Sequence, residues 1–239
     1  IDAMNNLGVL YYDQKKFDKA EQAYLKAVQN NNLEAMNNLG NLYKEQNKFD
    51  KAEQIYLKAS QKDSVAAINS LGVLYYDQKK FDKAEQMYLK ASQKGSVFAI
   101  YNLGNLYYYQ KKFDKAIADY DRAILLSPTN KNYWYNRTVC KMNTKDYAAV
   151  HKDIDMMIGR WADDAKVYAL NAETYLHEKD TLRAAEWLDK GLKHDPYDAP
   201  AWTMRAYISL SRKQWRDADT FLSKAIHLKP KNTDNYILW

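Results

Sequence analysis

The N-terminal half of the chain is built from copies of one short unit. The stretch NNLGVLYYDQKKFDKAEQAYLKA at residues 5–27 returns almost unchanged at residues 37–59 and 69–91, and a looser copy occupies residues 101–123. A unit this short cannot bury its apolar face alone, so neighbouring copies must stack to form a continuous core. The repetition therefore predicts an array of like units in which each unit contacts its neighbours in sequence.

Each unit is expected to contain two amphipathic helices. Apolar and aromatic residues recur at helical spacing in both halves of the first unit: Met4, Leu7, Leu10 and Tyr11, then Ala20, Tyr24 and Ala27. The small residues Gly8 and Ala20 would allow the two helices to pack closely where they cross. Asp18 and Glu21 have the spacing of an N-cap and capping box for the second helix, and Asp50/Glu53 and Asp82/Glu85 repeat this pattern.

These residues resemble the tetratricopeptide repeat. That family has a bulky residue at position 4, Leu-Gly at 7 and 8, Tyr at 11, Ala at 20, an aromatic residue at 24 and Ala at 27, and the first unit supplies Met4, Leu7, Gly8, Tyr11, Ala20, Tyr24 and Ala27. The shorter length of the first three units is also similar to Sel1-like repeats. At the family's usual period, later units begin at Lys131, Ala165 and Ala199, with Trp134, Tyr168 and Trp202 at position 4.

The resemblance implies an all-α, right-handed superhelical solenoid of about seven antiparallel helix pairs. Residues 1–130 would hold four near-identical repeats, of which the first three have 32 residues. Residues 131–239 would hold three diverged repeats of 34 residues and, in TDNYILW, the start of an eighth. The fifth unit carries Thr138, Val150 and Met157 where the others have Gly or Ala, so a local irregularity is expected there.

Composition and motifs indicate a protein without catalytic chemistry of its own. The net charge of +6 is small for a chain in which acidic and basic residues alternate, which makes a nucleic-acid partner unlikely on sequence grounds. No apolar run approaches the roughly 20 residues that span a bilayer, so we expect a soluble protein with no membrane insertion, in an undetermined compartment. No metal-ligand cluster, cofactor loop or nucleophile motif is present, and Cys140 is expected in the core.

The first helices of such repeats line the concave groove of the solenoid in this family. Position 6 carries carboxamides in four of the first five units, namely Asn6, Asn38, Asn102 and Asn136, with Ser70 in the third. A carboxamide both donates and accepts hydrogen bonds, so this row could hold the backbone of an extended peptide. Aromatic and apolar residues are expected beside it: Tyr12, Tyr76, Tyr101, Tyr108, Tyr135, Leu170 and Tyr207.

The charges along the groove predict what a partner would carry. Asp13, Glu45 and Asp77 make the N-terminal part acidic, whereas the C-terminal part is apolar, so a partner with a basic or polar stretch and an apolar anchor is expected. The pattern for a carboxylate clamp that receives chaperone tails is incomplete, which argues against that activity. Arg137 takes an apolar position and is expected to form a structural ion pair with Asp153 and Asp119.

The sequence therefore predicts a non-enzymatic scaffold or adaptor that binds a peptide or protein segment in the groove. Two alternatives stay open. Tyr236, Ile237 and Trp239 could leave an apolar end that drives end-to-end self-association. The chain could also be an accessory repeat domain of a larger protein or enzyme.

Overall fold

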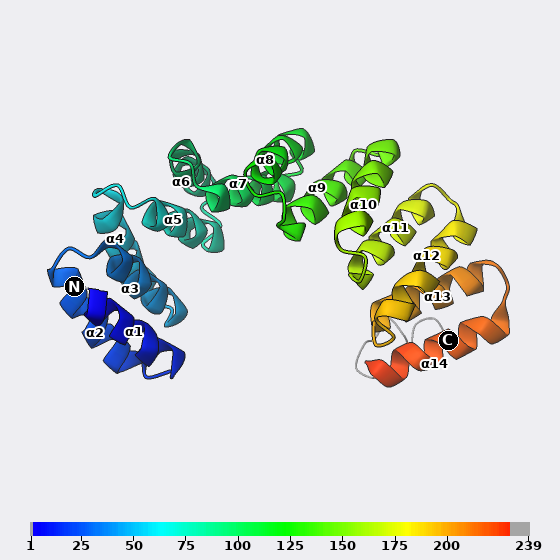
Figure 1. The fold of residues 1–239 in the computed structure, drawn as a ribbon, viewed down its shortest axis with the longest axis horizontal. Helices are drawn as coiled ribbons and strands as arrows, with labels where there is room; N and C mark the ends of the chain where they lie inside the picture. Colours follow the sequence, from blue (N-terminus) through cyan, green and yellow to red (C-terminus); the bar gives the residue numbers. More distant parts are fainter. Residues whose placement is uncertain (1, 230–239) are drawn as a thin grey trace. The chain divides into compact units, whose positions relative to one another are not determined.

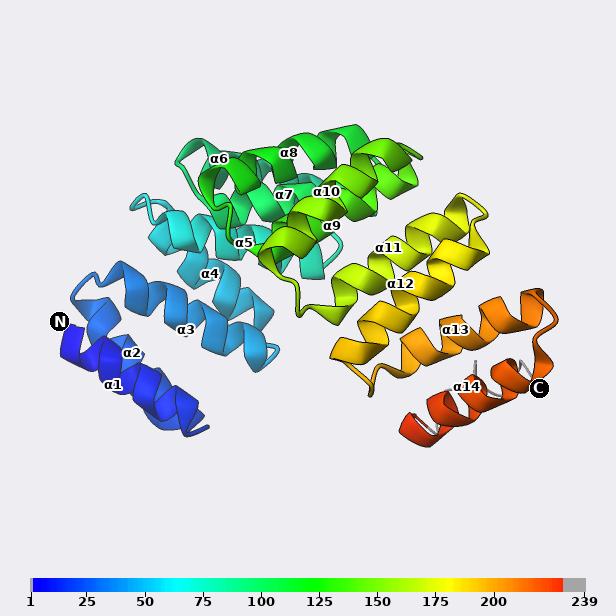
Figure 2. The ribbon, with the colours of Figure 1, turned by 45° about the vertical axis from the view of Figure 1, so that its right-hand side comes forward.

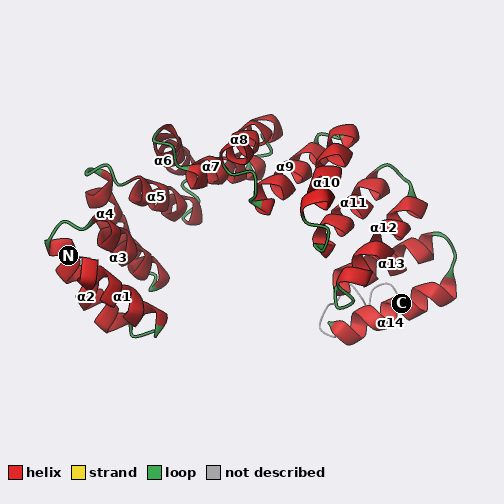
Figure 3. Cartoon of the chain, viewed as in Figure 1, coloured by secondary structure: helices red, strands yellow, loops and turns green. Residues whose placement is uncertain are grey.

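The chain folds entirely into helices over the residues that the computed structural model describes, 2–229. Within that range it has fourteen α-helices and no strand (Figures 1 and 3). In unit order they are α1 (Asp2–Asp13), α2 (Phe17–Gln29), α3 (Leu33–Glu45), α4 (Phe49–Ser60), α5 (Val65–Asp77), α6 (Phe81–Gln93), α7 (Val97–Tyr109), α8 (Phe113–Leu126), α9 (Lys131–Asn143), α10 (Tyr147–Arg160), α11 (Ala165–His177), α12 (Thr181–His194), α13 (Ala199–Ser211) and α14 (Trp215–Leu228). The prediction of seven helix pairs is confirmed, and the predicted eighth repeat, with Tyr236, Ile237 and Trp239, lies outside the described residues.

The helices form two compact units that divide between Tyr133 and Trp134. In unit 1, α2, α4 and α6 each pack against the first helix of the following repeat, and α1, α3, α5 and α7 also contact one another in succession (Figure 2). In unit 2, α10 packs on α11 and α12 packs on α13 in the same manner. The domain boundary predicted at residue 130 rests on repeat type and stays a prediction.

The two helices of each early repeat approach closely through a glycine that faces a tyrosine ring. A Cβ atom added to Gly8 would lie 2.4 Å from Tyr24, and one added to Gly40 would lie 2.3 Å from Tyr56. Gly72 and Gly104 face Tyr88 and Tyr120 in the same way. The predicted close crossing is therefore present, and it depends on the pairing of position 8 with position 24.

The predicted capping boxes are wrong. The second helix of the first repeat begins at Phe17, so Lys16 occupies the N-cap and makes no side-chain cap hydrogen bond. Asp18 lies one residue inside the helix, where its charge can only interact with the helix dipole. The first helices are capped instead: Asn32, Ser64 and Ser96 accept hydrogen bonds from the backbone N–H groups of Ala35, Ala67 and Ala99.

Glu21 and its counterparts link neighbouring repeats. The Tyr43 hydroxyl, on the first helix of the second repeat, donates a hydrogen bond of 2.8 Å to Glu21 on the second helix of the first repeat. The same bond recurs from Tyr75 to Glu53 and from Tyr107 to Glu85, each at 2.7 Å. Burial and the bond to Glu21 raise the pKa of Tyr43 to about 12. Each bond therefore joins a nearly buried tyrosine to the preceding repeat.

In the fifth repeat, Thr138 and Ile154 occupy positions 8 and 24, where the earlier repeats have glycine and tyrosine. Thr138 is fully buried, and its hydroxyl donates a 2.7 Å hydrogen bond to the Trp134 carbonyl on the same helix. Ile154 stands where the earlier repeats have tyrosine, which leaves room for the larger residue at position 8. The altered helix spacing expected in this repeat stays a prediction.

None of the helices in residues 2–229 combines the length and the apolar character needed to span a bilayer.

Candidate functional site

The surface of unit 1 that carries most predicted groove residues is formed by α1, α3, α5 and α7, and we call it the first-helix face. Because these four helices contact one another in succession, positions 5, 6, 12 and 13 of each repeat come close to their counterparts in the next. Asn6, Asn38, Asn102, Tyr12 and Tyr76 all belong to it. Its geometry depends on bonds between adjacent repeats.

The predicted carboxamide row is bonded within itself. Position 6 of each repeat donates to position 5 of the preceding repeat, and three such bonds are present: Asn38 Nδ2 to Asn5 Oδ1 at 3.0 Å, Ser70 Oγ to Asn37 Oδ1 at 2.9 Å, and Asn102 Nδ2 to Asn69 Oδ1 at 3.0 Å. Asn5 is buried, whereas Asn38 and Asn102 are half-buried and Asn6 is exposed. The row is therefore joined by hydrogen bonds between neighbouring repeats, which restrict the orientations of its side chains.

A second set of contacts joins position 12 of one repeat to position 13 of the next. The Tyr12 hydroxyl donates a short hydrogen bond to Glu45, and this bond, followed by burial, raises the pKa of Tyr12 to about 12. Lys44 forms a 2.8 Å ion pair with Asp77. The Tyr76 ring meets the Tyr109 ring edge-on, with centroids 6.1 Å apart.

These contacts reduce the acidity that the sequence indicates for this part of the chain. Asp77 is paired with Lys44, and Glu45 accepts a hydrogen bond from the Tyr12 hydroxyl. The expectation of a basic stretch in the partner stays a prediction, and it now rests mainly on Asp13 and Glu45.

The predicted aromatic residues of unit 1 differ in how accessible they are. Tyr108 is 39% exposed and lies beside Phe113, with ring centroids 5.8 Å apart. Tyr101 packs against Tyr120 and Tyr133 at 5.9 and 4.8 Å, so it contributes to the core as well as to the surface. Among the predicted rings of unit 1, Tyr108 is therefore the most exposed, and Tyr12, Tyr76 and Tyr101 are half-buried.

In unit 2 the predicted groove residues separate into buried and exposed positions. Leu170 is only 2% exposed, so its assignment to an accessible groove is wrong; this apolar side chain is part of the buried core. Tyr207 is 59% exposed on α13, and Tyr135 and Asn136 are half-buried on α9. Whether Asn136 continues the carboxamide row of unit 1 stays a prediction.

The predicted structural ion pair between Arg137 and Asp153 is present. The guanidinium donates two hydrogen bonds to the carboxylate, from Nε at 2.9 Å and from a terminal nitrogen at 2.6 Å, and Lys141 Nζ adds a third at 2.9 Å. Asp153 is 3% exposed, so these cations hold its charge inside the unit. Asp119 pairs with Arg122 at 2.9 Å in unit 1, and its pairing with Arg137 stays a prediction.

The sequence matches family models in its N-terminal half. Two models, each described as tetratricopeptide repeat, match residues 1–31 and 97–130, and residues 32–62 and 64–94. Together the matches cover more than half of the chain. The chain belongs to the tetratricopeptide repeat family. Tetratricopeptide repeats commonly mediate interactions between proteins.

Solved structures show the same fold at low sequence identity. A tetratricopeptide repeat protein from Parabacteroides merdae is 17% identical with a TM-score of 0.69, and the alignment covers 99% of this chain and 96% of that one. The C-terminal part of a repeat protein from Cytophaga hutchinsonii is 17% identical with a TM-score of 0.75, covering 97% of each chain. PilF of Pseudomonas aeruginosa is 18% identical with a TM-score of 0.61, covering 99% and 95%.

A comparison of the sequence with curated proteins gives no match. The structural likenesses therefore support the repeat fold and leave the partner of this tetratricopeptide repeat protein to be argued from its own side chains.

Proposed function

We propose that this tetratricopeptide repeat protein is a non-enzymatic scaffold that binds an extended peptide segment on the first-helix face of unit 1. The bonded carboxamide row carries the proposal, because its side chains are ordered before any partner arrives. Ordering a flexible side chain on binding costs roughly 0.5 to 1.5 kcal/mol. The side chains of the row are already ordered when the chain is folded, so binding a peptide would not carry this cost. An extended segment could donate its backbone N–H groups to the oxygens of Asn38 and Asn102.

The tyrosines next to the row would supply apolar contact area. Tyr12 and Tyr76 are half-buried and Tyr108 is exposed, so their rings could cover the side chains of a bound segment with little loss of conformational freedom. The backbone contacts would be independent of the partner's sequence, and the tyrosines and Asp13 would supply the selectivity.

The test is a selection of binders from a random dodecapeptide library against the full chain, followed by affinity measurement on variants. Asn102→Ala and Tyr76→Ala should each weaken the selected peptides by about tenfold, since one lost hydrogen bond or ring contact is worth about 1.4 kcal/mol. Gln54→Ala and Gln86→Ala, on exposed positions of the second helices α4 and α6, are the matched controls and should leave affinity unchanged. Peptides that respond to the control variants and ignore the first-helix variants would overturn the proposal.

A further inference from the structure

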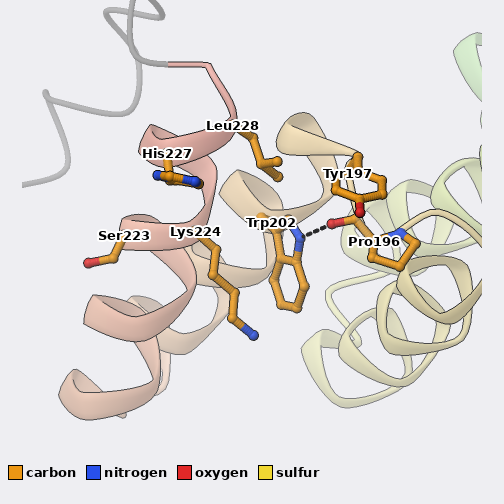
Figure 4. A pocket seen from close by; sticks show the side chains of 7 residues that line it. All are labelled: Pro196, Tyr197, Trp202, Ser223, Lys224, His227 and Leu228. Atoms are coloured by element: carbon orange, nitrogen blue, oxygen red, sulfur yellow. Dashed lines mark hydrogen bonds between the residues drawn. The ribbon is translucent and has the colours of Figure 1, made fainter.

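Unit 2 contains an open pocket that involves none of the residues of the first-helix face. The pocket has a volume of about 440 Å³ and lies between the loop that joins α12 to α13 and the C-terminal half of α14 (Figure 4). Its lining consists of Pro196, Tyr197, Trp202, Ser223, Lys224, His227 and Leu228. A hollow of this size can accept one or two large side chains of another molecule.

The indole N–H of Trp202, which lines the pocket, is already hydrogen-bonded within the chain. Trp202 Nε1 donates a 2.9 Å hydrogen bond to the Pro196 carbonyl, which fixes the indole ring (Figure 4). Tyr197 is 77% exposed beside it, and Leu228 is half-buried on α14. Removing these apolar surfaces from water would therefore favour binding of an apolar group.

In the two preceding repeats, a side chain from the end of the second helix lies against the aromatic residue at position 4. In the sixth repeat the His194 ring stacks on Tyr168 with centroids 5.0 Å apart, and His194 Nδ1 lies 3.8 Å from Asp163. In the fifth repeat the Arg160 guanidinium lies 4.8 Å from the centre of the Trp134 ring. In both cases a planar side chain from the end of the second helix covers the aromatic residue at position 4.

The seventh repeat has a different side chain at the end of its second helix, while Phe221 stacks on the Trp202 ring with centroids 5.5 Å apart. Counted from the repeat starts at Ala165 and Ala199, Leu228 stands in the place of His194 and Tyr197 stands in the place of Asp163. The His194–Asp163 pair of the sixth repeat is thus replaced by Leu228 and Tyr197, which line the pocket together with Trp202. These two positions therefore distinguish the lining of this pocket from the corresponding part of the sixth repeat.

One cation stands at the wall of the pocket. Lys224 Nζ lies 4.3 Å from the centre of the Trp202 ring, and among residues 2–229 no carboxylate forms an ion pair with it. The acidic residues of the loop are hydrogen-bonded to backbone N–H groups. Asp195 accepts a hydrogen bond from the Tyr197 N–H, and Asp198 caps α13 by accepting one from the Ala201 N–H. A ligand that buries apolar surface here and brings a carboxylate would therefore gain a charge-assisted contact.

We propose that this pocket binds a large apolar side chain of a partner polypeptide, next to an Asp or Glu whose carboxylate pairs with Lys224. The apolar side chain would lie against Trp202, Tyr197 and Leu228, as an anchor residue does at the centre of a protein interface. Since the site uses α13, α14 and the preceding loop, it is separate from the peptide surface proposed for unit 1. One partner could engage either site without the other.

The experiment measures binding of fluorescein-labelled hexapeptides to the full chain by fluorescence anisotropy. The probe is Gly-Glu-Leu-Phe-Glu-Gly, compared with Gly-Lys-Leu-Phe-Lys-Gly and Gly-Glu-Gly-Ser-Glu-Gly. The glutamate-flanked Leu-Phe peptide should bind saturably. The lysine-flanked peptide should bind at least about tenfold more weakly because its charge is opposite, and the Gly-Ser peptide should do so because it has no large apolar side chain. Raising the salt concentration should weaken the first peptide only modestly, because the apolar contact remains.

The decisive variant is the double substitution Tyr197→Asp with Leu228→His, which restores the pair found in the sixth repeat. Because His194 and Asp163 already occupy the equivalent positions of the sixth repeat, the variant should fold. Its affinity for the peptide should fall by about tenfold or more. Lys224→Ala should remove the preference for glutamate-flanked over lysine-flanked peptide. Arg216→Ala, on the exposed side of α14, is the control and should bind like the original chain.

Three results would overturn the proposal. One is the absence of saturable binding by any of the peptides up to about 1 mM. Another is equal affinity of the restored double variant and the original chain. The last is binding that appears only when Tyr236, Ile237 and Trp239 are replaced by serine, because the chain's own residues would then be the occupant.

Discussion

Substitution of Gly72 by alanine tests the packing rule that sets how closely the helices of a repeat approach. The added Cβ would lie 2.6 and 2.7 Å from two ring carbons of Tyr88 and 3.3 Å from the Cβ of Met87. Tyr88 is 2% exposed, so its ring cannot swing into solvent to make room. Overpacking of this kind costs about 1 to 3 kcal/mol, whereas alanine in place of glycine inside a helix contributes about 1 kcal/mol of stability. We expect a net loss of about 1 kcal/mol.

The chain supplies both a control and a rescue for this substitution. Gly159→Ala, on α10, places a Cβ where no atom lies within 4 Å, so it should show the helix-propensity gain alone. In the sixth and seventh repeats alanine at position 8 is paired with leucine at position 24, as in Ala172 with Leu188. The double variant Gly72→Ala with Tyr88→Leu should therefore be more stable than the sum of the single effects predicts, by about 1 to 3 kcal/mol.

The measurement is urea unfolding of the full chain with two signals. All six tryptophans lie after residue 133, so tryptophan fluorescence reports unit 2, whereas far-ultraviolet circular dichroism reports both units. Gly72→Ala should lower the unfolding midpoint measured by circular dichroism and leave the midpoint measured by tryptophan fluorescence unchanged. Gly159→Ala should lower neither midpoint. If Gly72→Ala stabilised unit 1 by as much as Gly159→Ala stabilises unit 2, or if the double-variant coupling were near zero, the steric reasoning would be refuted.

Three further predictions concern titration, reactivity and the buried ion pair. Burial and the bond to Glu21 raise the folded-state pKa of Tyr43 to about 12, so its contribution to stability should be complete below pH 10 and lost as the pH rises through 12. Absorbance at 295 nm, which reports tyrosinate, and helicity should therefore change together. Tyrosinate formation well before the loss of helix would contradict this. Burial raises the pKa of the Cys140 thiol to about 12, so a disulfide reagent should label it only after unit 2 unfolds, as rates with and without urea will show. Asp153→Asn leaves the cation of Arg137 without its buried counter-charge and should cost about 3 to 5 kcal/mol in thermal or urea unfolding; a loss below about 1 kcal/mol would show the pair to be dispensable.

The repeat pattern was sufficient to predict the fold, because period and apolar spacing act locally within each unit. Helix starts at Lys131, Ala165 and Ala199 agree with the predicted repeat starts even where the sequence has diverged. The capping boxes failed for a local reason: the spacing of Asp18 and Glu21 is that of a cap, but the helix begins one residue before Asp18. A two-residue motif does not determine where a helix starts.

The side-chain contacts between repeats could not be predicted from the sequence. Glu21 and Tyr43 are 22 residues apart and meet only because the second helix of one repeat packs on the first helix of the next. The same holds for Asn5 and Asn38, so a carboxamide row that looked available in sequence turned out to be partly bonded to itself. Spacing within one unit carries no information about such pairs until the stacking is known.

Chemical-shift mapping of the full chain with a selected peptide tests the central claim, that unit 1 binds its partner through the first-helix face. Addition of the peptide should shift the side-chain amide signals of Asn38 and Asn102, together with backbone signals of α1, α3, α5 and α7. Signals of the second helices α2, α4, α6 and α8 should move little. Shifts confined to the second helices, with the asparagine side-chain signals unchanged, would contradict the account.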